Sequence, residues 1–117
     1  MTATDSRFLR AVIDSVPDPV LVADLEHTIV FMNRAAVSHY SKGEALLGTN
    51  LLDCHNSRSN KVILEVLEAL HAGEEERLIT DNEKHRIFMR AVRDTDGTLV
   101  GYYERYEPPA PASGKAA

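Results

Sequence analysis

Apolar positions near the start of the chain recur at helical spacing, which predicts an amphipathic helix over residues 5–16. Asp5 or Ser6 can cap the start of this helix, and Pro17 ends it. The apolar stripe consists of Phe8, Leu9, Val12, Ile13 and Val16. This stripe can pack on the protein's own sheet or form the seam of a dimer, and the spacing leaves both interpretations open.

Alternating or short apolar runs bounded by turn residues predict five strands in two groups. The strands are expected at residues 19–23, 28–32, 77–80, 85–93 and 99–106. Residues 94–97 (Asp-Thr-Asp-Gly) form a strong hairpin turn between the last two.

The long strand over residues 85–93 has two different faces. One face is apolar and is expected to point inward, with Ile87, Met89 and Ala91. The other face is mixed, which suits a surface half covered by the N-terminal helix. It carries Phe88, Arg90 and Val92.

The segment between the two strand groups predicts helices. Asn33 can cap a short helix that runs through Tyr40, and residues 42–47 form a helical turn that stops at Gly48. A longer helix over residues 60–72 is expected, with Ser59 or Asn60 as its N-cap and Gly73 as its stop. The whole order predicts an α+β protein, a five-stranded antiparallel sheet with helices on one face.

Composition indicates one soluble-type domain. The chain has 117 residues, of which 44% are apolar and 26% charged. The domain is expected over residues 1–107, because the Pro- and Ala-rich residues 108–117 have no large apolar side chain to bury. The net charge of −5 argues against nucleic acid or an anionic membrane as partner, and no apolar run approaches the ~20 residues of a membrane span. The single cysteine, Cys54, fits a reducing, cytoplasmic setting.

Catalytic motifs are missing from the sequence. It contains no nucleophile elbow, phosphate loop or paired-carboxylate motif, and residues 74–76 (Glu-Glu-Glu) are expected to be a solvated charge run. We therefore expect no enzymatic activity, and an output that lies in a partner or in a longer parent chain.

His55 is the residue on which the functional question depends. It lies in a short polar loop just before the longer helix, with apolar residues on both sides. Such a histidine can cap a helix terminus, or its neutral imidazole can bind iron, with Asp53 as a candidate acceptor for its other nitrogen. The other four histidines show no zinc-site spacing.

The order of elements resembles the PAS domain, a sensory and dimerising module, over nearly the whole chain up to Glu107. Residues 14–24 (DSVPDPVLVAD) look like the PAS opening, and residues 29–36 (IVFMNRAA) look like its second strand and the Asn that follows. Residues 92–101 (VRDTDGTLVG) look like the final hairpin. The resemblance implies a PAS fold and a homodimer.

The loop from His55 to Ser59 resembles the His-Pro-x-Lys-Ser loop of carbon-monoxide-responsive haem regulators, with Asn56 in place of the proline. This resemblance implies haem b with His55 as the iron ligand, sensing a diatomic gas or redox state. Ile79 falls near the distal position and cannot bind iron, which implies an open or weakly ligated sixth position. The other expected pocket residues are Arg58, Ser59, Val62, Ile63, Val66, Leu67, Met32 and Met89.

Two alternatives stay open beside haem. One is a cofactor-free module that dimerises or docks a downstream signalling domain or protein. The other is a pocket for a small apolar or carboxylate metabolite, in which Arg58 and Ser59 bind the acid group.

Overall fold

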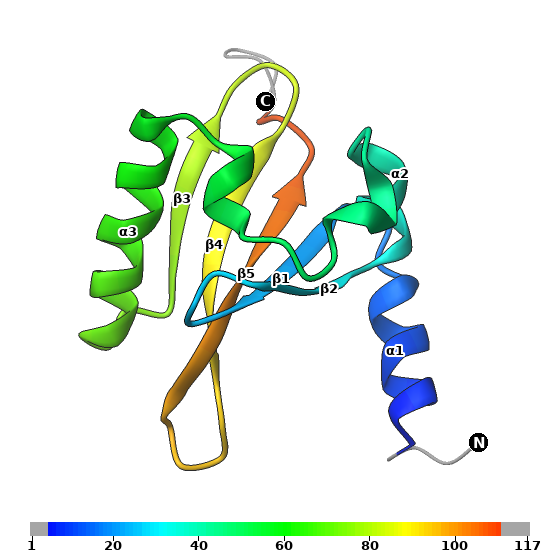
Figure 1. Cartoon of the computed structure of the whole chain (residues 1–117), viewed down its shortest axis with the longest axis horizontal. Helices are drawn as coiled ribbons and strands as arrows, with labels where there is room; N and C mark the ends of the chain where they lie inside the picture. Colours follow the sequence, from blue (N-terminus) through cyan, green and yellow to red (C-terminus); the bar gives the residue numbers. More distant parts are fainter. Residues whose placement is uncertain (1–4, 111–117) are drawn as a thin grey trace, which may run out of the picture.

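The computed structural model describes residues 5–110, apart from the side chain of Cys54, and shows five antiparallel strands in the order β2-β1-β5-β4-β3 (Figure 1). The strands are β1 Val20–Asp24, β2 Ile29–Met32, β3 Glu76–Asp81, β4 Arg86–Arg93 and β5 Leu99–Glu107. The last strand, β5, therefore lies in the middle of the sheet, between β1 and β4. The predicted α+β class and all five predicted strands are confirmed.

The helical segments are three α-helices and two short 3₁₀ helices. They are α1 Ser6–Asp14, α2 Arg34–His39, η1 Gly43–Leu46, η2 Leu51–Cys54 and α3 Ser57–His71. Figure 1 shows α3 beside β3 at one end of the molecule, α2 at the other end, and α1 set apart. Between α2 and α3 the chain crosses the sheet through η1 and η2.

The hydrophobic core lies between the sheet and α3. Met89 in β4 is fully buried, as the predicted inward face requires, and it packs in one cluster with Leu21, Ile63, Val66 and other buried residues. Burial of each such side chain stabilises the folded state by about 1.5–3 kcal/mol relative to leaving it exposed to water.

The outer face of the sheet is covered differently from the prediction. The Arg105 guanidinium lies over the ring of Phe88 in β4, 4.2 Å from its centroid. Helix α1 lies near β2, where Arg10 is 4.8 Å from the ring centroid of Phe31. The expectation that α1 half covers β4 was wrong, because β1 and β5 separate β4 from the edge strand β2.

Asn33 ties the end of α1 to the sheet and to α2. Its buried side chain accepts hydrogen bonds from the backbone N–H groups of Val20 and Ala36, the latter as the predicted helix cap. Its amide nitrogen donates to the carbonyls that follow α1, at 3.3 Å to Val16 and 3.0 Å to Asp18. One amide therefore satisfies the backbone of three segments.

Helix α3 begins earlier than predicted. The predicted cap, Ser59 or Asn60, was wrong: the side chain of Asn56 accepts from the Ser59 backbone N–H at 2.8 Å, and the helix starts at Ser57. Asn60 instead donates its side-chain N–H to the carbonyl of Leu52. The cap at Asn56 places His55 directly before it.

The last strand is followed by a segment without regular structure. Strand β5 ends at Glu107, and the next three residues form no helix or strand. The rest of the predicted tail, residues 111–117, lies outside the described residues.

Candidate functional site

A cavity of about 310 Å³ lies between the sheet and the helical layer. It is walled by the first half of α3, by β3, β4 and β5, and by the end of α2. The lining residues are Tyr40, His55, Arg58, Ser59, Val62, Ile63, Ile79, Thr80, Ile87, Glu104 and Tyr106. Its size is at the lower end of the range of small-molecule sites, about 300–1,000 Å³.

Six of the residues expected from the sequence line this cavity. They are His55, Arg58, Ser59, Val62, Ile63 and Ile79. The other four expected residues, Met32, Val66, Leu67 and Met89, lie in the hydrophobic core and do not line it. Val66 and Leu67 are one turn further along α3, where the helix packs directly on the sheet.

His55 has one ring nitrogen held by the backbone. Its Nδ1 lies 2.9 Å from the carbonyl oxygen of Leu51. A carbonyl only accepts, so Nδ1 carries the proton and Nε2 keeps a lone pair in the neutral ring. The expected acceptor, Asp53, was wrong: η2 turns the Leu51 carbonyl toward the imidazole.

Glu104 is the most unusual residue of the cavity, because it is an acidic residue that is only 3% exposed. In the sheet it lies opposite Leu21 of β1 on one side and Met89 of β4 on the other, both buried and apolar. Among the described residues, its Oε2 has no hydrogen-bond partner. A buried polar atom left in this way costs about 1–3 kcal/mol.

The environment of Glu104 favours the protonated carboxyl. Burial raises the pKa of Glu104 above its ordinary value, and positive charge on His55 lowers it in part. The two side chains therefore form an electrically linked pair inside one cavity, although no direct hydrogen bond joins them within the described structure.

The inward face of β5 carries three polar-tipped side chains in a row, Tyr102, Glu104 and Tyr106. The Tyr102 hydroxyl lies 2.7 Å from Nδ1 of His27, and the Tyr106 hydroxyl lies 2.5 Å from that of Tyr40. Burial raises the pKa of both Tyr102 and Tyr106, so both stay neutral phenols. Of the three side chains, only Glu104 has a buried oxygen without a hydrogen-bond partner among the described residues.

Five lining residues were not among the expected pocket residues: Tyr40, Thr80, Ile87, Glu104 and Tyr106. Period two along the last strand places Glu104 on the same face as Tyr102 and Tyr106, which was the available signal. A glutamate in a strand usually faces water, so the alternation by itself does not show that this one is buried.

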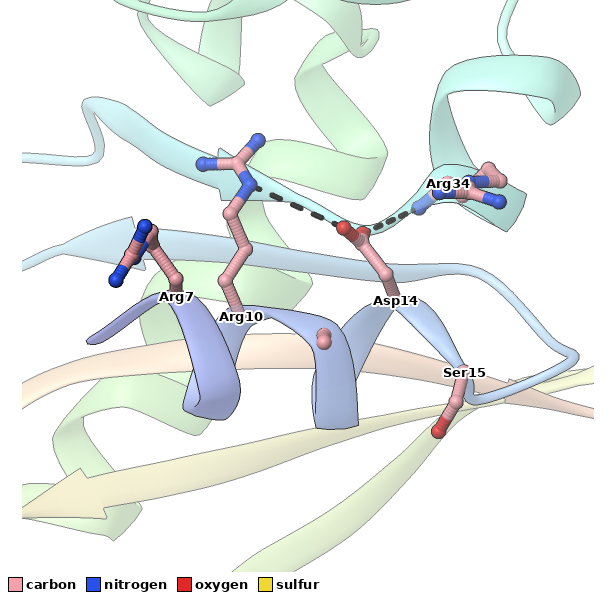
Figure 2. Close-up of a pocket in the computed structure, with 6 residues that line it drawn as sticks. Arg7, Arg10, Asp14, Ser15 and Arg34 are labelled. Atoms are coloured by element: carbon pink, nitrogen blue, oxygen red, sulfur yellow. Dashed lines mark hydrogen bonds and ion pairs between the residues drawn. The ribbon is translucent and has the colours of Figure 1, made fainter. Parts of the chain in front are cut away.

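A second cavity lies at the junction of α1 and α2, and Figure 2 shows Asp14 there between the Arg10 side chain and the backbone of Arg34. One oxygen of Asp14 accepts from the Arg34 backbone N–H at 3.0 Å, and the other is 3.9 Å from Nε of Arg10 (Figure 2). Both oxygens of this carboxylate are therefore engaged, and we interpret the cluster as a link between α1 and α2.

The described side chains include no group of three or more His, Cys, Asp or Glu residues placed to hold a metal ion. None of the described helices has the length and apolar character that crossing a membrane requires.

Comparison with known families identifies the fold. The PAS domain model matches residues 7–84, most of the described chain. The chain belongs to the PAS family. No curated protein matches the sequence.

Solved structures agree with this assignment. The PAS domain superimposes on the C-terminal domain of a Streptococcus mutans protein with a TM-score of 0.74 and 16% identity, covering 89% of this chain and 84% of that one. A PAS domain from Colwellia psychrerythraea gives 0.67 and 16%, covering 89% and 97%. The PAS domain of Bordetella pertussis BvgS gives 0.67 and 19%, covering 92% and 88%. Identities this low show a shared fold alone.

Proposed function

We propose that this PAS domain is a sensor that binds a small molecule in the cavity around Glu104 and signals through a dimer formed by α1. The observation that carries the proposal is the unsatisfied Oε2 of Glu104, which is buried in a cavity rather than packed in the core. A purely structural module gains nothing from such a group, since an apolar residue there would be more stable. A ligand that bonds to the carboxyl explains both the cavity and the carboxyl.

The dimer part of the proposal rests on α1. None of its nine residues is buried, and even the apolar stripe is exposed, with Leu9 at 52% and Val12 at 50%. Between the two interpretations of the stripe, this exposure favours a seam with a second copy. The output then belongs to a downstream domain or partner protein, with no catalytic step in the PAS domain itself. The cytoplasmic setting expected from Cys54 belongs to the same proposal.

A library of small amphipathic compounds, followed by two-dimensional NMR of the backbone amides, tests the pocket. We expect binders whose shifts cluster on β5, the His55 loop and the start of α3. Ile87→Phe should fill the cavity and abolish these shifts. Val92→Phe is the matched control, because Val92 lies on the outer face of the same strand and does not line the cavity. Binding that survives Ile87→Phe, or no binder at all, would contradict the proposal.

Haem b, with gas or redox sensing, is the second candidate function. It is favoured by the Nδ1 contact of His55 with Leu51, which leaves Nε2 as a potential iron ligand. The cavity as it stands does not fit a porphyrin, because its volume of about 310 Å³ is at the lower limit for far smaller ligands. The expected wall residues Val66, Leu67 and Met89 are also packed in the core. We therefore assign no step to haem.

Hemin titration separates the two candidates. If the cavity around Glu104 binds a small molecule other than haem, hemin should give only weak, broad absorbance changes that are the same in the wild type and in His55→Ala. A sharp Soret band in the wild type that is lost in His55→Ala would show that haem, and not another small molecule, is the ligand.

A further inference from the structure

We infer that the cavity takes a small amphipathic primary amine, whose ammonium group lies between Glu104 and His55. This inference rests on the proposed ligand-binding function and adds the chemical class of the ligand. It comes from the hydrogen-bonding capacity that the folded chain leaves unused inside the cavity.

When Glu104 is ionised, the unused groups are acceptors. The Oε2 of Glu104 has no partner within the described residues. His55 donates from Nδ1 to Leu51, so its remaining polar atom, Nε2, is an acceptor in the neutral ring. The nearby hydroxyls of Tyr40 and Tyr106 are engaged with each other. An ammonium group carries three donors and no acceptor, and therefore complements two acceptors in one enclosed space.

The charge of Glu104 also favours an amine as the ligand. A carboxylate buried between Leu21 and Met89 lacks a fixed countercharge, and His55 supplies positive charge only when it is protonated. A ligand ammonium supplies that charge directly, and charge-assisted bonds to a carboxylate are the stronger class of hydrogen bond. Where Glu104 is protonated in the free protein, the entering ammonium displaces that proton to solvent, and the carboxylate and ammonium pair.

The rest of the cavity selects the body of the ligand. Val62 and Ile63 on α3, Ile79 on β3 and Ile87 on β4 form apolar walls. A volume of about 310 Å³ suits a short branched chain or a single small ring.

The same charge argues against the carboxylate metabolite considered from the sequence. Arg58, the cation expected to bind an acid group, is exposed at the rim of the cavity. Glu104 lies at its buried end, where the ionised carboxylate would repel an acid group and the protonated carboxyl would offer it no countercharge. An anion could thus reach Arg58 only at the surface.

Three probes with the same five-carbon skeleton test the inference: isopentylamine, isopentyl alcohol and isovalerate. Each is titrated into the full chain and followed by backbone NMR. We expect the amine to bind about tenfold or more tightly than the alcohol, and isovalerate to leave the cavity resonances unshifted. Glu104→Gln should weaken amine binding about tenfold and leave alcohol binding nearly unchanged. Glu107→Gln, on the outer face of the same strand, is the control and should change neither.

A second measurement does not depend on a variant. Calorimetric titrations of isopentylamine in buffers of different ionisation enthalpy, at a series of pH values, should show release of protons from the wild type at pH values where the free protein holds Glu104 protonated. If the alcohol or isovalerate binds the cavity as tightly as the amine, the amine inference fails and the ligand pocket stands. If the amine binds with no proton release and equally to Glu104→Gln, the assigned contact is wrong. If library compounds bind while none of the three probes does, the amine class is overturned and the sensor proposal is kept.

Discussion

At the residue scale, the central feature is a carboxyl group placed where the sheet would accept an apolar side chain. Glu104 lies between Leu21 and Met89, and both neighbours come from strands distant in sequence. Its burial decreases the stability of the folded protein, as functional groups inside a core commonly do.

Replacing this carboxyl should stabilise the protein. In Glu104→Leu, we expect the free energy of unfolding to rise by about 1–3 kcal/mol, because the unsatisfied oxygen is removed. Urea denaturation followed by circular dichroism measures the change. Glu107→Leu is the contrasting variant: it breaks ion pairs of the outer face with Arg86 and Arg105, and should not stabilise the protein. A Glu104→Leu protein less stable than the wild type would show that the carboxyl is satisfied in solution.

The pKa of Glu104 also predicts a pH dependence. A carboxyl whose pKa is raised on folding binds its proton more tightly in the folded than in the unfolded state. Its stabilising contribution is therefore present below the ordinary value of 4.5 and is lost as pH rises through the raised folded value. We expect the stability of the wild type relative to Glu104→Gln to fall over this window.

Urea denaturation at a series of pH values measures that difference. Carboxylates with lowered pKa, such as Glu76 beside Arg105, have the opposite dependence, but they are common to both proteins and cancel. A stability difference that is constant with pH, or that grows as pH rises, would mean that the Glu104 pKa is not raised.

At the scale of elements, α1 stands out, because it has a clear apolar stripe and no buried residue. It is held at its end by Asn33 and Asp14, while the stripe stays exposed. The helix is thus held in place while its apolar stripe stays exposed to solvent. A helix that pairs with a second copy of the chain requires both properties.

Charges on the stripe should separate the dimer. Leu9→Asp combined with Ile13→Asp places two carboxylates on the seam, and we expect sedimentation to shift to the monomer. Ala11→Asp, about 200° around the helix from Leu9, is the control and should leave the dimer intact. A wild type that already sediments as a monomer at high concentration would refute the seam.

The pairing of β1 with β5 depends on one glycine. Gly101 lies opposite Asp24, and a Cβ added to it would come within 2.5 Å of the carbonyl oxygen of Ala23. We expect Gly101→Ala to lower the free energy of unfolding by about 1–3 kcal/mol, because two central strands must separate. Val100→Ala, at the exposed neighbouring residue, should have a smaller effect in the same urea experiment. Equal effects would show that the close approach is relieved at little cost.

At the scale of the molecule, the cavity and the proposed seam belong to one connected structure. Glu104 is paired in register with Leu21 of β1, and the strand begins next to the carbonyls of Val16 and Asp18, which Asn33 holds. A ligand at Glu104 therefore acts on the strand that continues from α1.

We expect saturation with isopentylamine to change the dimer dissociation constant by about fivefold or more, a typical coupling between sites. Sedimentation equilibrium with and without the amine measures it, and Glu104→Gln should show no change. Equal dissociation constants in the wild type would mean that the pocket and α1 are independent.

The sequence by itself determined the elements of this protein. Period two and period 3.6 located the five strands and the main helices, and a local cap such as Asn33 was readable because its partner, Ala36, is three residues away. The family resemblance and the position of His55 before α3 were readable for the same reason, since both depend on residues close together in the chain.

Tertiary structure alone decided the site. Nothing local shows that Glu104 is buried, because Leu21 and Met89 meet it only through strand order and register. The Leu51 carbonyl reaches His55 only through the turn of η2, and the exposure of the α1 stripe depends on which strand the helix approaches. Periodicity tells which side of an element is apolar, whereas the surroundings of a polar side chain depend on partners distant in sequence, and these partners made a core glutamate the centre of the pocket.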